Sequence, residues 1–125
     1  MLALLLLPAT LLAASGFSVI SHADLLKRLQ SRDILLLDVR TPAEFAAGHI
    51  ANAINIPHDE LVNRVGELLR NQNMEIAIYC RSGRRSIQAL TLLQAQGFRR
   101  LSHVEGDFLG WQAAGLAIVG VESVP

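Results

Sequence analysis

Apolar runs of strand length alternate with segments of helical spacing along most of this chain. The runs 34–39 (ILLLDV) and 75–80 (EIAIYC) are almost continuously apolar, which is typical of strands that are buried on both faces of a parallel sheet. Shorter strands are predicted at 19–20, 53–56 and 99–106. Because strands that alternate with helices form parallel β–α–β units, the pattern predicts a three-layer α/β domain. Its central, mainly parallel sheet of four or five strands is flanked by helices.

Helix signals occupy the segments between the predicted strands. The clearest begins at Thr41, which is a suitable N-cap, with Pro42 at the first helical position and Glu44 at the third. Gly48 marks the end of this short helix. Further helices are expected over 22–31, 59–72, 84–97 and 107–115.

The N-terminal segment 1–15 differs from the rest of the chain. It is apolar from Leu2 to Ala14 with few interruptions, but it is too short to cross a bilayer comfortably as a helix. Small residues near Ser15 suit cleavage, so we expect a signal peptide and export, as to a bacterial periplasm. No basic residue precedes the apolar run, and a buried helix or an uncleaved membrane tether are the alternatives. Membrane contact is expected only if the segment is uncleaved, and residues 16–125 are expected to form the domain.

Charge and cysteine content exclude two classes of protein. Eleven basic and eleven acidic residues give a formal net charge of zero, whereas proteins that bind nucleic acid through overall charge are strongly basic. The chain has one cysteine, so its fold does not depend on an internal disulfide. A local anion site remains compatible with this composition.

The single cysteine, Cys80, ends the predicted strand 75–80, and ligands of parallel sheets bind beyond the carboxyl ends of the strands. The following stretch, 81–86, is rich in arginine and leads into a predicted helix. Backbone N–H groups at a helix start and nearby guanidinium groups both favour the thiolate, which is the nucleophilic form of cysteine. Cys80 is therefore the candidate nucleophile. The candidate substrate-binding residues are Arg81, Ser82, Gly83, Arg84, Arg85 and Ser86.

Other residues near the predicted site have structural interpretations. Cys80 could be a buried strand residue, as free cysteines often are, although the polar and basic stretch after it would pack poorly in a core. Asp38 and Arg40 are supporting candidates, and Arg40 is expected mainly to pair with Asp38 or Glu44. No metal site is expected, because the histidines lack ligand spacing with one another or with Cys80.

Three stretches resemble a known family: DVRTPAEFAAGHIANAINIP, YCRSGRRS and VEGDFLGW. Together they resemble a single-domain rhodanese, or thiosulfate sulfurtransferase, over residues 18–115. With the apolar N-terminus, the chain looks most like the small periplasmic rhodaneses of the phage-shock type. Members of the family often have a second glycine where Asp107 stands and a proline where Ala117 stands.

The resemblance implies a two-step sulfur transfer. Cys80 would take the outer sulfur of thiosulfate or a similar anionic donor as a persulfide, and a thiol or cyanide would then accept that sulfur. The resemblance implies no cofactor. Two alternatives remain open, namely a catalytically idle binding module and a phosphatase or arsenate reductase of the same fold. Phosphatases of this fold place an arginine six residues after the cysteine, where this chain has Ser86.

Overall fold

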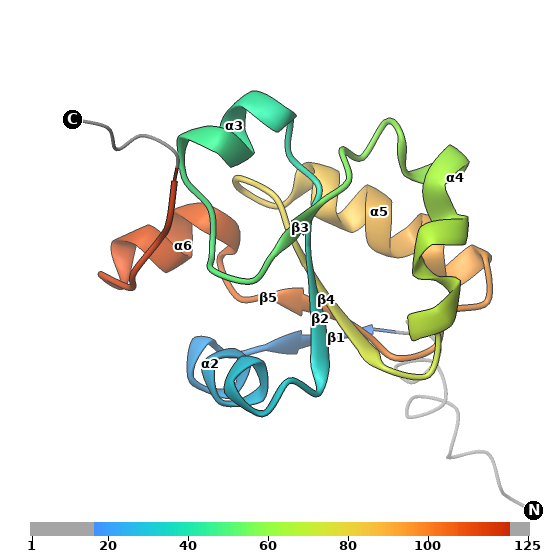
Figure 1. The fold of residues 1–125 in the computed structure, drawn as a ribbon, viewed down its shortest axis with the longest axis horizontal. Helices are drawn as coiled ribbons and strands as arrows, with labels where there is room; N and C mark the ends of the chain where they lie inside the picture. Colours follow the sequence, from blue (N-terminus) through green and yellow to red (C-terminus); the bar gives the residue numbers. More distant parts are fainter. Residues whose placement is uncertain (1–16, 121–125) are drawn as a thin grey trace, which may run out of the picture.

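A parallel sheet lies at the centre of the computed structural model, which describes residues 17–120 (Figure 1). Within this part of the chain every strand pairing is parallel, which confirms the predicted sheet. The order of the five strands is β1 (Phe17–Ile20), β5 (Leu101–Val104), β4 (Glu75–Tyr79), β2 (Ile34–Asp38) and β3 (Ile54–Asn55). The expected signal segment 1–15 lies outside the described residues.

Helices cover both faces of the sheet (Figure 1). One face carries α2 (His22–Ser31) and α6 (Asp107–Ala113). The opposite face carries α4 (Leu61–Arg64), the 3₁₀ helix η1 (Val65–Asn71) and α5 (Arg84–Ala95). The short helix α3 (Pro42–Ala47) follows β2. None of the helices in the described range has the length and apolar character needed to span a membrane.

The two faces of the central strands contact different core clusters. In β4, Ile76 and Ile78 lie in the cluster beneath α5, whereas Ala77 and Tyr79 lie in the cluster beneath α2 and α6. This alternation follows from the period of two residues in a strand. Cys80 continues the first series, so the register of β4 directs it to the α5 side.

Three predicted elements differ clearly from the structure. The strand predicted at 99–106 is confined to Leu101–Val104. The strand predicted at 53–56 is confined to Ile54–Asn55. Beyond it the N–H groups of Ile56 and His58 still donate to the carbonyls of Asp38 and Val39, so the chain follows the end of β2 without forming a regular strand.

The helix predicted over 59–72 is divided into α4 and η1, with a non-helical backbone at Arg64. Gly66 lies just after this junction, and glycine is among the poorest helix formers. The prediction of one continuous helix was therefore wrong.

Local signals correctly placed the ends of α3. Thr41 accepts a hydrogen bond from the Glu44 backbone N–H, and the Glu44 carboxylate accepts one from the Thr41 backbone N–H, forming the predicted capping box. Trp111 and Phe108 are buried in the core. His49 is a structural residue, since its ring stacks on Phe45 and its Nδ1 lies 2.7 Å from the Phe45 carbonyl oxygen.

Candidate active site

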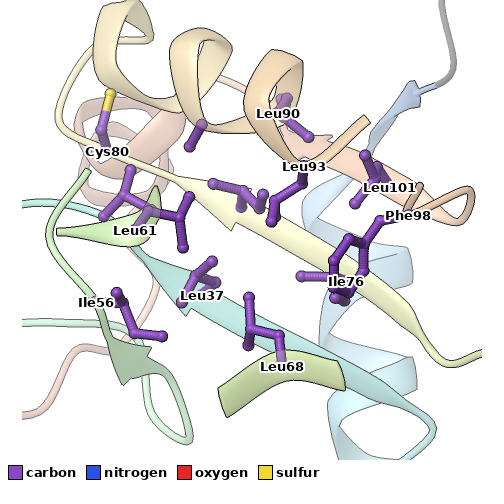
Figure 2. Packing of buried hydrophobic residues seen from close by; sticks show 13 residues of the cluster. Leu37, Ile56, Leu61, Leu68, Ile76, Cys80, Leu90, Leu93, Phe98 and Leu101 are labelled. Atoms are coloured by element: carbon purple, nitrogen blue, oxygen red, sulfur yellow. The ribbon is translucent and has the colours of Figure 1, made fainter. Parts of the chain in front are cut away.

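Cys80 lies at the end of β4 and is almost fully buried, with 1% of its surface exposed. Figure 2 shows it at the edge of the apolar cluster, with its sulfur pointing away from Leu61 and toward the first turn of α5. The backbone after it is anchored from α6, because the N–H groups of Phe108 and Leu109 donate to the carbonyls of Cys80 and Arg81. The sulfur therefore faces polar backbone, although its Cβ packs on the core.

The loop after β4 aims two backbone N–H groups at the sulfur. The N–H of Gly83 donates to Sγ of Cys80 at 3.1 Å, and the N–H of Ser86 donates at 3.3 Å. Gly83 has φ +126°, a conformation that residues with a side chain rarely adopt. This arrangement favours a negatively charged sulfur and is the type of anion cradle found at helix N-termini.

The three arginines of the loop have different surroundings. Arg81 and Arg84 are exposed, and both line an open pocket of about 510 Å³ next to the loop. Arg85 lines the same pocket, but its guanidinium forms a two-pronged ion pair with Glu44 of α3, with N···O distances of 2.7 and 3.1 Å. Arg81 and Arg84 are thus the arginines with solvent-facing charge beside the site. Ser82 and His58 line the same pocket.

The Arg85–Glu44 pair makes stability dependent on pH. The hydrogen bond from Arg85, opposed by burial and assisted by Thr41, lowers the pKa of Glu44 from 4.5 to about 2. A carboxylate with a lowered pKa stabilises the fold above pH 4.5, and the stabilisation is lost as the pH falls toward 2. We expect Glu44→Gln, which keeps the capping box, to be less stable than wild type at neutral pH and equally stable near pH 2.

Urea unfolding at the two pH values measures this difference. Glu60→Gln is the control, because Glu60 is half exposed in its pair with Arg64 and should change stability little at either pH. An equal deficit of Glu44→Gln at both pH values would contradict the assignment of the pH dependence to this pair.

Asp38 and Arg40 form a buried ion pair after β2. Their side chains are 0% and 3% exposed, and the guanidinium of Arg40 donates to both Asp38 carboxylate oxygens and to the Gly48 carbonyl. The guanidinium also lies 4.1 Å from the ring centre of Phe108. Arg40 therefore pairs with Asp38, one of the two predicted partners, and the pair fixes the loop between β2 and α3.

Two residues of the site were missed by sequence reasoning. The Asp107 carboxylate, which is 2% exposed, accepts hydrogen bonds from the backbone N–H of Cys80 at 3.0 Å and from the hydroxyl of Ser86 at 2.9 Å. Nε2 of His103 lies 3.0 Å from the same carboxylate. Burial acts to raise the pKa of Asp107, but hydrogen bonding with the side chain of His103, the backbone N–H of Cys80 and the hydroxyl of Ser86 outweighs it and lowers the pKa. The sequence signal that could have identified Asp107 is its position, where members of the resembled family often have a second glycine.

Comparisons with known proteins match this chain to one family of domains. Residues 21–114 match the family model described as the rhodanese-like domain. A protein of Allochromatium vinosum named sulfurtransferase is 39% identical over 104 residues, covering 82% of this chain and 95% of that protein. Further curated relatives at 35–36% identity are longer, and the chain covers 43–55% of their length.

Solved structures show the same architecture. The crystal structure of a rhodanese-related protein from Thermoplasma volcanium aligns with a TM-score of 0.72 at 34% identity, covering 82% of this chain and 97% of that one. A thiosulfate sulfurtransferase from Pseudomonas aeruginosa aligns with a TM-score of 0.76 at 24% identity, over 89% of this chain and 22% of its own. The second similarity is one of fold alone.

Proposed function

Because this chain belongs to the rhodanese-like domain family, we propose that it is a thiosulfate sulfurtransferase that carries sulfur on Cys80. The observation that carries this proposal is the position of Sγ at the carboxyl end of β4, where it accepts hydrogen bonds from the N–H groups of Gly83 and Ser86. The proposed donor is thiosulfate or a similar sulfane anion, and the proposed acceptor is a thiol or cyanide.

The geometry supports a two-step reaction. In the first step Sγ attacks the outer sulfur of the donor, the donor's S–S bond breaks, and sulfite leaves with the bonding electron pair. The two N–H groups stabilise negative charge on the sulfur, and fixed donors of this kind need no reorganisation during the reaction. In the second step the acceptor attacks the outer sulfur of the persulfide, and Cys80 leaves with the electron pair of that bond.

Turnover with thiosulfate and cyanide tests the proposal. We expect thiocyanate and sulfite to form in equal amounts, with no hydrolysis of an aryl phosphate. An idle binding module would form neither product, and a phosphatase would hydrolyse the phosphate ester instead. Either result would contradict the proposed function.

The exposed charges of Arg81 and Arg84 should attract the anionic donor. We expect Arg81→Ala and Arg84→Ala each to raise the KM for thiosulfate by up to about fivefold, since an exposed charge pair contributes roughly 0.2–1 kcal/mol. Added salt should reduce the difference from wild type. Arg99→Ala is the control, because Arg99 is exposed just before the start of β5, whereas the site lies at the carboxyl end of the neighbouring strand β4. An unchanged KM in both loop variants, at low and at high salt, would rule out this role.

We also propose that segment 1–15 is a signal peptide and that the protein acts after export. The apolar run and the small residues before Gly16 support this proposal. Expression of the full chain in a bacterium with a periplasm should yield a protein cut near Ser15 in the periplasmic fraction. Full-length protein in the cytoplasm would contradict it.

A further inference from the structure

A polar network reaches the sulfur of Cys80 from the side of α6. Oγ of Ser86 lies 3.5 Å from Sγ, 2.9 Å from a carboxylate oxygen of Asp107, 3.0 Å from Nε2 of His103 and 3.0 Å from the Gly83 carbonyl oxygen. Ser86 is fully buried, whereas the side chain of His103 is 18% exposed. The hydroxyl of Ser86 thus connects the buried sulfur to a histidine at the surface.

The backbone around this network has unusual conformations. Asp107 has φ +54° although it is not glycine. The absence of a side chain at Gly83 leaves room for the Asp107 carboxylate, because a Cβ at position 83 would lie 3.2 Å from an Asp107 oxygen. Left-handed conformations at non-glycine residues are uncommon and often mark functional sites. Attachment of the loop after β4 to α6 does not by itself need a histidine next to the Asp107 carboxylate.

His103 can balance the negative charges that gather around Cys80 when its thiol loses a proton. An ionised Asp107 next to a thiolate would place two negative charges in one buried site, which is unfavourable unless a cation compensates. When the proton of the Cys80 thiol moves to His103, the sulfur becomes negative and the His103–Asp107 pair becomes neutral. The other charged or titratable groups on β4, α2, α5 and the turn before α6 are exposed or bonded elsewhere. They are Glu75 and Tyr79 on β4, His22, Asp24, Lys27 and Arg28 on α2, Arg84 and Arg85 on α5, and Glu105 in the turn.

We propose that Ser86 and the His103–Asp107 pair form a proton relay for Cys80, a role that rests on the proposed sulfur transfer. In loading, the S–H bond of Cys80 breaks, its proton passes to Oγ of Ser86, and the hydroxyl proton of Ser86 passes to Nε2 of His103, which then donates to the Asp107 carboxylate. Sγ then bonds to the outer sulfur of the donor, and sulfite leaves with the electron pair. In unloading, the acceptor takes the outer sulfur, Cys80 leaves with the electron pair, and the proton returns through Ser86. Ser86, His103 and Asp107 are positioning residues, because they act through the sulfur of Cys80.

Steady-state turnover of the full chain with thiosulfate and cyanide tests the relay. We expect His103→Ala and Ser86→Ala each to lower kcat by about 100-fold, the usual contribution of a proton-transfer group, and to leave the KM for thiosulfate unchanged. Added imidazole should restore turnover to His103→Ala, and it should not restore turnover to Ser86→Ala. His22→Gln is the matched control, because His22 contacts the same turn through the Glu105 carbonyl and lies outside the network.

Each outcome decides for or against the relay. A wild-type kcat in His103→Ala would overturn it, and so would a loss that imidazole does not restore, since that loss would be structural. If the wild-type protein transfers no sulfur, the proposed function fails, and the relay is then tested by the rate at which iodoacetamide alkylates Cys80, a reaction that also removes the thiol proton. At neutral pH we expect His103→Gln to be alkylated more slowly than wild type. Equal alkylation rates in wild type and His103→Gln would contradict the relay.

Discussion

Cys80→Ser is expected to reduce sulfur transfer to the rate of the uncatalysed reaction, while the fold is kept. A serine oxygen cannot form a persulfide, so the first step has no product to pass on. Serine is small enough for the space between β4 and α5, and its oxygen can accept the N–H groups of Gly83 and Ser86 in place of the sulfur. The loss should therefore appear in kcat, without the unfolding that a disrupted core would cause.

Thiocyanate production and circular dichroism measure the two parts of this prediction. The Cys80→Ser protein should show the wild-type spectrum and melting behaviour, with no thiocyanate above the buffer control. A variant that still produces sulfite from thiosulfate at the wild-type rate would show that the reaction does not pass through Cys80. An unfolded variant would instead show that the sulfur is needed for packing, and Cys80→Ala would then be used for the kinetic comparison.

Asp38→Asn should cause the largest loss of stability among the variants considered. The substitution leaves the Arg40 guanidinium buried without its negative partner. Burial acts to lower the pKa of Arg40, but hydrogen bonding to Asp38 and the charge of Asp38 outweigh it and raise the pKa, so this group stays charged. Removing one partner of a buried ion pair typically costs about 3–5 kcal/mol. For a domain of this size we expect the melting temperature to fall by more than about 10 °C.

A paired substitution separates charge from packing at this position. Asp38→Leu combined with Arg40→Met removes both charges, and exchange of a buried ion pair for apolar residues is often neutral or stabilising. We expect the double variant to be more stable than Asp38→Asn in urea unfolding. A loss below about 1 kcal/mol in Asp38→Asn, typical of an exposed pair, would show that the pair contributes little in its buried position.

Much of the fold could be predicted from the sequence because its strongest signals are local. The apolar runs that became β2 and β4 are long enough to be recognised without knowledge of their neighbours, and the capping residues Thr41 and Glu44 fix the start of α3. The helix predicted over 59–72 failed because apolar spacing alone does not distinguish an α-helix from α4 followed by a 3₁₀ helix. Both forms bury Leu61 and Leu68.

The candidate site was only partly predictable, because some of its contacts join distant parts of the chain. Position in the sequence placed Cys80 and the basic loop together, but it could not show that Arg85 pairs with Glu44, 41 residues away. The roles of His103 and Asp107 depend on the packing of α6 against the end of β4. Residues that reach the sulfur through another side chain leave no spacing pattern in the sequence.

Intact-mass measurement of the purified wild-type protein after incubation with thiosulfate tests the central claim most directly. Sulfur carriage on Cys80 predicts that the protein gains the mass of one sulfur atom and returns to its original mass when cyanide is added. Cys80→Ser should gain nothing under the same conditions. An unchanged mass of folded wild-type protein, or the same gain in Cys80→Ser, would contradict the assignment of Cys80 as the sulfur carrier.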